Sequence, residues 1–593
     1  MAVDVSRKGP EKIMKHEEKR PVPAGGLWTE EGVSFSVAVP KGKSCKLCIY
    51  RGNHTKPYRV IQMEEDILYG DIRSSGIQTD IRDGDEYIYE IDGAPYVDPY
   101  AHGIRKYMET EQDGTEVECR RAVLCTPDFE WEHDRPLDLP DEDVIAYSLH
   151  VRGFTKGQSS RVKYKGTFAG IIEKIPYFQE LGINQIQCMP VYEFEDRIRF
   201  ASNYWGYGEA YCFAPKKRYA KGNPVRELKE MVYSCHKAGI EVVLHLPFFD
   251  EMPKQKMIEC LRYYRQEYHV DGFIVNPYTV PLEVIQSDDY LKHMKLIVKN
   301  EDFQNVMRRF LKGDEGMVES VIWHLKHLSQ NDYQYHTITD HTGFTLNDLV
   351  SYDGKHNERN GENNHDGPDY NYSWNCGAEG PTRKKGILRL REQQMRNAFF
   401  LLLMAQGTPC ILAGDEFANS QNGNNNVYCQ DNETAWVDWK RAAKEQWLTD
   451  YVRKLIQFRK QHKILHLSSE PSTECQGIDL ARCGVPDISY HGENAWQVPN
   501  EIASRQLGVF YSGAGKGEDD LYIAYNMHWE DHTFALPSPG KGKRWRKIFS
   551  TTDREGFLGE ESVICQERKA MIEARSVAVF TGETYETTNT KKK

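Results

Sequence analysis

Both ends of the chain alternate apolar and polar residues. Near the start this pattern covers Val33–Val39 and Glu86–Ile91, and short runs of the same kind return at Gly508–Tyr511, Leu521–Asn526 and Ser576–Phe580. Alternation with a period of two is typical of strands that bury one face. The pattern therefore predicts β structure at both ends.

The middle of the chain has a different pattern. Two short apolar runs, Ile183–Val191 and Ile240–Leu246, are each followed by a segment with apolar residues at helical spacing, Leu228–Ala238 and Lys254–Tyr268. A third apolar run, Gly272–Val275, comes next. Strands that alternate with helices predict a parallel sheet with crossover helices, and the length of this region permits a (β/α)8 barrel. No run marks the sixth strand of such a barrel.

Together these patterns predict a multidomain α/β protein, with a central (β/α)8 TIM-like barrel between an N-terminal and a C-terminal β-sandwich. A chain of 593 residues is too long for one ordinary domain. The predicted parts are a flexible tail at 1–20, a β-sandwich at 21–110, a connector at 111–140, the barrel at 141–467 and a C-terminal β domain at 468–593.

Composition argues against several kinds of partner and cofactor. The net charge is −12, whereas nucleic-acid binding depends on clustered Lys and Arg, so we expect no nucleic-acid partner. No apolar run approaches the roughly 18 residues of a membrane span, and residues 1–20 lack the apolar core of a secretory signal. The 14 cysteines show neither CxxC pairs nor Cys/His ligand spacing. We expect reduced thiols in a cytoplasmic protein with no metal, no cofactor and no membrane association.

Seven long stretches match a known family: Asp128–Pro136, Leu149–Lys156, Asn203–Tyr207, Gly343–Tyr352, Lys355–Glu362, Asn371–Gly380 and Gly423–Trp439. They are similar to the bacterial glycogen-debranching and isoamylase branch of the α-amylase superfamily. Gly32–Val37 and Tyr87–Gly93 also resemble the carbohydrate-binding β-sandwich that precedes the barrel in that family. The resemblance covers nearly the whole chain. It implies the barrel fold and an α-glucan ligand such as glycogen, starch or a malto-oligosaccharide.

The resemblance fails at the motifs that carry the family's chemistry. The family uses an Asp nucleophile, a Glu acid and a second Asp at the ends of barrel strands, with an Arg two residues before the nucleophile. In the first motif His245 stands for an Asp and Asp250 for a His. In the second motif Ile274 replaces the Arg, and Asn276 replaces the nucleophile.

The two remaining motifs are changed in the same way. Lys299 stands where the acid belongs, and Thr342 replaces the last Asp, while His341 is retained. An amide cannot form the glycosyl-enzyme ester, so none of these positions is predicted to be an intact catalytic residue. Only about 20 residues separate Asp250 from Asp271, so an active-site loop that is long in the family is short here. We therefore expect no hydrolysis of the family kind.

Two predictions concern the geometry of the barrel mouth. The side chains of His245, Asn276, Lys299 and Thr342 are expected to converge at the carboxyl ends of the strands. No pair of carboxyl groups is expected at the separation of about 5–5.5 Å that a retaining glycosidase needs. The other carboxylates of this region have simpler interpretations: Asp415–Glu416 as structural groups, and Asp250–Glu251 and Asp340 as solvated surface groups.

Sugar contact is predicted for Tyr204, Trp205, Tyr207 and His341, with core packing as the alternative for the aromatic residues. Three functions remain open. The first is a non-catalytic glucan-binding or regulatory protein of glycogen or starch metabolism. The second is an active α-1,6-glucosidase that uses non-standard groups such as Asp250, Glu251 or Asp340. The third is a structural partner subunit of an active isoamylase.

Overall fold

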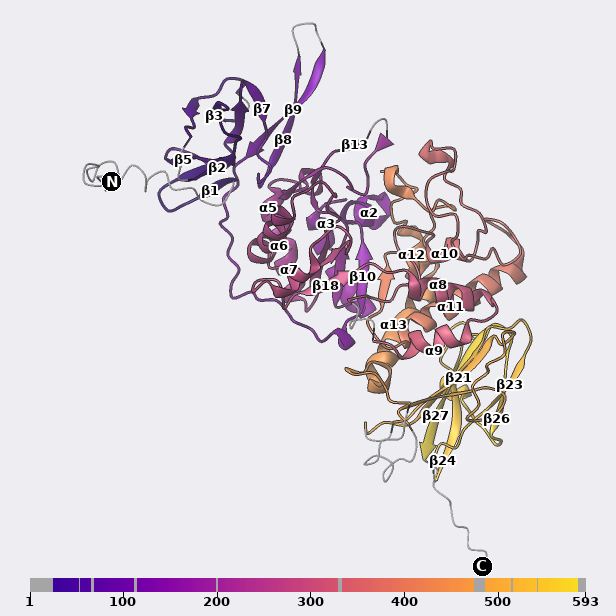
Figure 1. The fold of residues 1–593 in the computed structure, drawn as a ribbon. Helices are drawn as coiled ribbons and strands as arrows, with labels where there is room; N and C mark the ends of the chain where they lie inside the picture. The colour runs from indigo at the N-terminus through magenta and orange to yellow at the C-terminus, as the bar shows by residue number, and fades with distance from the viewer. Residues whose placement is uncertain are drawn as a thin grey trace, which may run out of the picture.

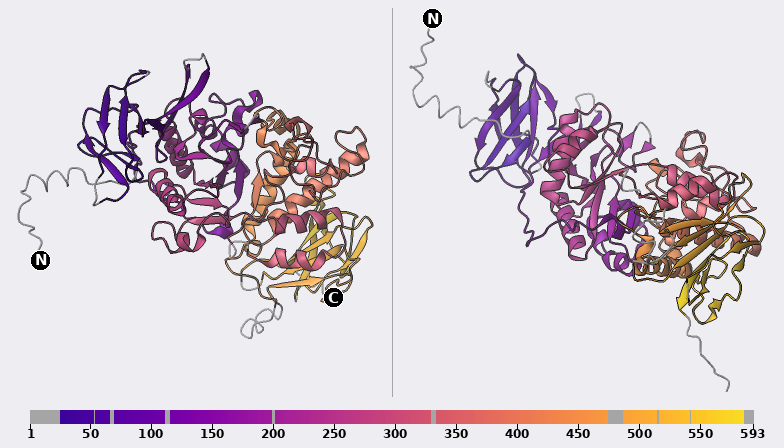
Figure 2. Two further views of the ribbon diagram at one scale, coloured as in Figure 1. Left: turned by 45° about the horizontal axis from the view of Figure 1, so that its top comes forward. Right: turned by 60° about the horizontal axis from the view of Figure 1, so that its bottom comes forward.

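The computed structural model describes residues 25–52, 54–65, 69–110, 115–198, 201–328, 333–473, 486–513, 516–540 and 542–584. The predicted tail at 1–20 lies outside these residues. Figures 1 and 2 show strands at the two ends of the molecule and a helix-rich part between them. This order agrees with the pattern of the sequence, whereas the predicted limits of the individual domains stay predictions.

The N-terminal strands form two antiparallel sheets. One has the order β1-β2-β5, and the other has the order β4-β3-β6-β9-β8 with β7 paired to β6. Their buried faces share a core that includes Phe35, Leu47 and Tyr89, as alternation of apolar residues predicts. The strands are β1 Gly25–Trp28, β2 Val33–Ala38, β3 Cys45–Tyr50, β4 Arg59–Gln62, β5 Ile72–Gln78, β6 Glu86–Ile91, β7 Ala94–Tyr96, β8 Ile104–Thr110 and β9 Glu116–Val123.

The central sheet has six parallel strands in the order β18-β17-β16-β11-β10-β19. They are β10 Ala146–Leu149, β11 Gln185–Cys188, β16 Glu241–His245, β17 Gly272–Val275, β18 Lys295–Val298 and β19 Cys410–Leu412. A seventh segment lies between the two edge strands: Val298 N donates to Tyr333 O at 2.5 Å, and Cys410 N donates to His336 O at 2.8 Å. His336 also forms a parallel bridge with Pro409.

The described residues thus form six strands and one further segment at a strand position. The prediction of eight strands is not met within these residues. Helices α8 (Asp302–Lys312) and α9 (Val318–Lys326) follow β18 with only residues 313–317 between them, so no strand separates these two helices. Because the residues between α8 and α9 form no strand, no apolar run of the sequence marks a sixth strand there. This short connection also brings the end of β18 directly beside the segment that contains Asp340.

Helices cover the outside of the central sheet, and their ends follow from the sequence. Asn223 begins α5 by accepting hydrogen bonds from Val225 N and Arg226 N, and Pro224 occupies the first turn. The remaining helices are α2 Val151–Lys156, α3 Phe168–Ile172, α4 Ile175–Leu181, α5 Pro224–Lys237, α6 Lys254–Tyr268, α7 Leu282–Ser287, α10 Leu346–Leu349, α11 Lys385–Met404, α12 Lys440–Lys444 and α13 Gln446–Gln461. Two short antiparallel pairs follow β11 along the chain. They are β12 (Tyr192–Phe194) with β15 (Ala210–Pro215), and β13 (Arg197–Ile198) with β14 (Ala201–Ser202). In the part of the chain that the structure describes, no helix is long and apolar enough to cross a membrane.

The C-terminal strands form a six-stranded antiparallel sheet, β20-β21-β22-β27-β24-β25, and a pair, β23-β26. Aromatic packing joins this sheet to the barrel helices, since the rings of Phe400 on α11 and Phe549 on β24 lie 5.0 Å apart. Arg396 Nε also donates to Thr551 O at 2.8 Å. The strands are β20 Ile488–His491, β21 Gln506–Tyr511, β22 Leu521–Asn526, β23 His532–Ala535, β24 Lys543–Ser550, β25 Val563–Ile564, β26 Lys569–Ile572 and β27 Ser576–Thr584.

Candidate functional site

The carboxyl ends of the central strands surround a cavity of about 60 Å³. His245, Ile274, Lys299 and His341 line it, and Asp340 lies among them. Of the four side chains predicted to converge, His245 and Lys299 are in this lining. Pockets for small ligands usually enclose about 300–1,000 Å³. The cavity has room for a few water molecules but not for a sugar ring.

Lys299, Asp340 and Thr342 form one connected group at the end of β18. Lys299 Nζ lies 3.0 Å from Asp340 Oδ2 and donates to Thr342 Oγ1 at 2.8 Å. Thr342 donates to Asp340 Oδ1 from its backbone N and its hydroxyl, both at 2.7 Å. Burial alone raises the pKa of Asp340, but Lys299, His341 and Thr342 hold that pKa well below its ordinary value. Asp340 is therefore an ionised, paired carboxylate and not a proton donor.

Two neutral histidines lie at the mouth, of which His245 is buried and His341 is partly exposed. Burial, together with the nearby Lys299 ammonium, lowers the pKa of His245 to about 3. The same two causes lower the pKa of His341. The imidazole rings lie 5.7 Å apart, and His341 Nε2 shares a 2.6 Å hydrogen bond with the hydroxyl of Tyr207. These rings can accept or donate hydrogen bonds, but they carry no charge at neutral pH.

The prediction that four side chains converge is wrong for Asn276. Its side chain is exposed, and Asn276 Oδ1 accepts from Tyr278 N at 3.0 Å. The chain turns immediately after β17, and this local hydrogen bond holds the amide at the turn. Asp250 is also exposed, and its Oδ1 accepts from Thr279 Oγ1 at 3.0 Å. Lys299 and Thr342 touch each other, and His245 shares the cavity with Lys299.

The carboxylates of this region fall into three environments. Among the described residues that line the cavity, Asp340 carries the only carboxylate, so no pair faces across it. The prediction that Asp340 is a solvated surface group is wrong, because it is buried against Lys299. Glu251 is exposed. Asp415 and Glu416 are buried: Asp415 accepts from Leu346 N at 2.9 Å, and Glu416 accepts from Tyr147 Oη at 2.7 Å.

The aromatic residues predicted to contact sugar differ in exposure. Tyr204 is buried and stacks on His150 with ring centroids 4.0 Å apart. Trp205 is buried with its ring 5.1 Å from that of His341. Tyr207 remains partly exposed. Tyr204 and Trp205 therefore pack the wall of the mouth, and of the three aromatic residues Tyr207 has the most accessible ring.

Sequence reasoning missed the contact between Lys299 and Asp340 and the role of His150. The first had a signal, because opposite charges stand at two strand-end motifs where the family has other residues. His150 Nδ1 accepts from Gly153 N at 2.9 Å, and His150 Nε2 lies 2.8 Å from Tyr204 O. His150 thus begins α2 and holds the Tyr204 loop, a role that no local pattern indicates.

The fold defined by these elements is that of solved pullulanase structures. The structure matches a pullulanase type I from Bacillus subtilis with a TM-score of 0.70 and 18% identity, over 96% of this chain and 86% of that chain. It also matches the catalytic module of the glycogen-degrading pneumococcal virulence factor SpuA with a TM-score of 0.72 and 17% identity, over 97% of this chain and 100% of that module.

Sequence relatives specify the family further. The chain is 31% identical to the "Glycogen operon protein GlgX homolog" of Mycobacterium tuberculosis, over 74% of this chain and 76% of the relative. It is 30% identical to the glycogen debranching enzyme of Erwinia tasmaniensis (76% and 85%) and 29% identical to chloroplastic isoamylase 1 of Arabidopsis thaliana (90% and 84%). No protein-family model matches the chain. The chain belongs to the family of isoamylases and GlgX-type glycogen debranching enzymes.

Proposed function

We propose that this protein is a non-catalytic α-glucan-binding or regulatory protein of glycogen or starch metabolism, in which the family's catalytic residues have been replaced. The group of Lys299, Asp340 and Thr342 carries the proposal. In this group a lysine and a carboxylate form an ion pair between two strand ends, so that their opposite charges cancel. The cytoplasmic location predicted from the sequence belongs to the same proposal.

The chemistry of a retaining glycosidase argues against hydrolysis at this mouth. Such an enzyme needs an acid and a nucleophile with carboxyl groups about 5–5.5 Å apart. Here Asp340 is bound by an ammonium, and the amide of Asn276 is exposed and engaged with Tyr278 N. The alternative of an active α-1,6-glucosidase would need a second carboxylate at the cavity, and its described lining offers Asp340 alone.

Glucan binding is supported by relatives and by one exposed aromatic side chain. Among the solved structures of the same fold is a Bacillus subtilis pullulanase complexed with maltose. Tyr278 follows β17 at the carboxyl end of the sheet, and it is 95% exposed. An aromatic ring that stands free in water at a barrel mouth offers a face to the apolar side of a sugar ring. We assign Tyr278 and Tyr207 as the contacts of a glucan chain that lies across the mouth.

Affinity electrophoresis in gels that contain glycogen or pullulan tests the binding. The full chain is expected to be retarded relative to a glucan-free gel. The retardation of Tyr278→Ala is expected to be several-fold smaller. Tyr290→Ala is the matched control, because Tyr290 is also exposed (57%) but precedes β18, at the opposite end of the strands. Equal retardation of both variants would overturn the assignment of Tyr278. A parent chain that is not retarded at all would favour the partner-subunit alternative.

A further inference from the structure

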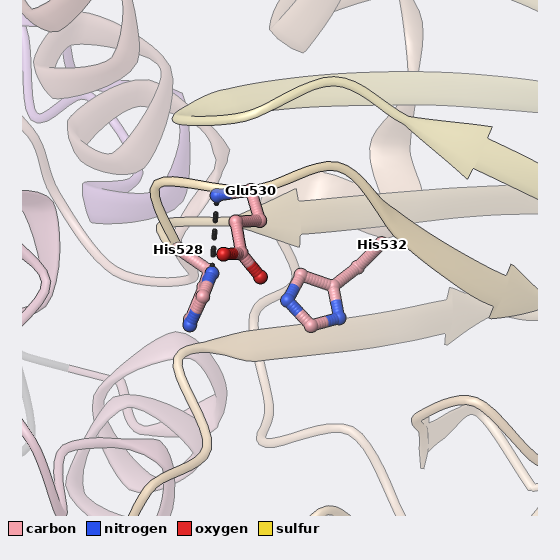
Figure 3. Close-up of side chains that lie close together, drawn as sticks. All are labelled: His528, Glu530 and His532. Carbon is pink, nitrogen blue, oxygen red and sulfur yellow. Dashed lines mark hydrogen bonds between the residues drawn. The ribbon is translucent and has the colours of Figure 1, made fainter.

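The turn between β22 and β23 in the C-terminal β region brings together three side chains that can bind a metal ion. One ligand atom from each of His528, Glu530 and His532 lies within 4.8 Å of the other two. Figure 3 shows the carboxylate of Glu530 between the two imidazole rings. The three residues are separated by one position each along the chain, so a single turn supplies the whole group.

His532 points an unsatisfied nitrogen into this group. Its Nε2 is buried without a hydrogen-bond partner in the part of the chain that the structure describes, and it faces the carboxylate of Glu530 (Figure 3). Its other nitrogen, Nδ1, shares a 3.4 Å hydrogen bond with Gln506 Nε2 and lies 3.8 Å from Glu493 Oε1. A histidine that binds a metal through one nitrogen usually gives the hydrogen of its other nitrogen to a carboxylate or carbonyl. Glu493 takes that role once its exposed side chain closes to hydrogen-bond distance and the ring proton moves to Nδ1.

His528 also presents a lone pair to the group. Its Nδ1 accepts a hydrogen bond from Glu530 N at 3.1 Å, so the neutral ring carries its proton on Nε2 and its lone pair on Nδ1. A metal ion bound through Nδ1 replaces this hydrogen bond, and the Glu530 N–H, at an exposed residue, is then hydrated where it stands. The carboxylate of Glu530 is exposed and has no ion-pair or hydrogen-bond partner among the described residues.

The turn that carries the three residues is fixed before any ion binds. Asn526 is fully buried, and its Nδ2 donates to Glu530 O at 2.9 Å and to Ile572 O at 3.0 Å. Asn526 Oδ1 accepts from His528 N at 3.1 Å, and Arg575 N donates to His528 O at 2.9 Å. Backbone groups on both sides of the group are therefore held, and little ordering remains for the ion to impose.

We propose that His528, Glu530 and His532 bind a divalent transition-metal ion of the Zn²⁺ class. Two imidazoles and one carboxylate are a ligand set that Zn²⁺ takes, with bonds of about 2.0–2.2 Å and a fourth position for water. Bonds of that length require ligand atoms closer together than 4.8 Å, so the free carboxylate of Glu530 rotates toward the rings. No carboxylate pair of the kind that hard ions such as Ca²⁺ prefer is present in the group.

The position of the group suggests what the ion does. Arg575 Nη1 donates to Lys312 O at 3.0 Å, and Arg505 Nε donates to Gly313 O at 2.7 Å, so the same region contacts the end of α8. The positive charge of Arg505 is paired with Glu315 at 2.9 Å, which reduces its repulsion of a bound cation. An ion at this turn ties the end of β22 to the start of β23, beside the contacts that join the C-terminal sheet to α8.

Isothermal titration calorimetry of the full chain with Zn²⁺ tests the proposal. The expected result is one saturable site per chain, weakened at least tenfold in His532→Ala and in Glu530→Gln, and weakened about tenfold in Glu493→Gln. His293→Ala is the control, because His293 is an exposed histidine outside the group, and it should bind as the parent does. Glu530→Gln changes an exposed side chain only, so the test does not depend on a variant that fails to fold.

Thermal unfolding supplies the second readout. Zn²⁺ should raise the melting temperature of the parent by a few degrees, chelator should reverse the rise, and the rise should be absent in the His528→Ala, Glu530→Gln, His532→Ala triple variant. Equal Zn²⁺ affinity in the parent and the triple variant would assign the binding to other groups, such as the cysteines, and would overturn the proposal. Absence of saturable binding by the parent would overturn it as well.

Discussion

The contact between Lys299 and Asp340 decides how the barrel mouth behaves at the scale of single residues. Asp340 is buried, while one third of the Lys299 side chain is exposed. The two groups therefore depend on each other unequally. Lys299 can turn to water when its partner is lost, whereas Asp340 keeps only its hydrogen bonds from Thr342.

We predict that Lys299→Met lowers the free energy of unfolding by about 2–3 kcal/mol, because it leaves a buried carboxylate without its cation. Lys299→Met combined with Asp340→Asn should recover most of that loss, since no unpaired charge remains. Lys292→Met, which breaks an exposed pair with Asp289, should change stability by less than about 0.5 kcal/mol. Urea unfolding of the four proteins measures these values. If Lys299→Met is as stable as the parent, the pair does not hold Asp340.

A second prediction at the scale of single residues concerns His245 and the dependence of stability on pH. Its pKa is about 3 in the folded chain and about 6.5 when unfolded, so the unfolded chain binds a proton first as the pH falls. Stability should therefore be lost progressively between pH 6.5 and about pH 3, at up to about 1.4 kcal/mol per pH unit from this one group. His245→Gln should reduce the slope of unfolding free energy against pH in that window. An unchanged slope would mean that His245 is protonated in the folded chain.

At the scale of elements, the strand ends show how far sequence reasoning reaches. The helix predicted at Lys254–Tyr268 has those bounds in the structure, and the run Ile240–Leu246 contains β16, because both carry strong apolar periodicity. The strand count and the Lys299–Asp340 contact were not predictable in the same way. Both depend on how closely the fold brings the end of β18 to the segment that starts at residue 333. Local sequence patterns do not encode that distance. The exposed turn at Asn276 likewise depends on where β17 ends.

Gly272 tests the packing of β17 against β18. A Cβ at this position would lie 2.3 Å from the backbone oxygen of Lys295, its partner in the strand pairing. Gly272→Ala should therefore cost about 3 kcal/mol or more in unfolding free energy, because backbone must move. Gly386→Ala in α11 meets nothing within 4 Å and should stabilise the chain by about 0.5–1 kcal/mol. Equal effects in urea unfolding would contradict the strand pairing.

Repair of the strand-end motifs tests whether the residues act as a unit. Asn276→Asp alone should give no measurable gain in hydrolysis of pullulan or glycogen, because Ile274 occupies the place of the arginine and the new carboxylate keeps the exposed turn. The comparison is with the parent and with a variant that combines Asn276→Asp, Ile274→Arg, Lys299→Glu and Thr342→Asp. A large gain from the single change would show that the remaining machinery is intact.

At the scale of the whole molecule, the family architecture is kept, and our proposal is that the centre of its chemistry has changed. The relatives match up to 91% of the chain, and the solved structures cover up to 98% of it. The described residues form six parallel strands between N-terminal and C-terminal antiparallel sheets. A scaffold kept at this completeness can still present a glucan-binding surface or dock onto another chain without cleaving a bond.

Release of reducing ends from glycogen and pullulan, at high protein concentration and beside an active debranching relative, tests the central claim most directly. Our account predicts that the parent chain releases no more reducing ends than buffer, while the same preparation is retarded in glucan-containing gels. Release that grows with time and protein concentration, and that disappears in Asp340→Asn, would contradict the account and would make Asp340 part of an active site.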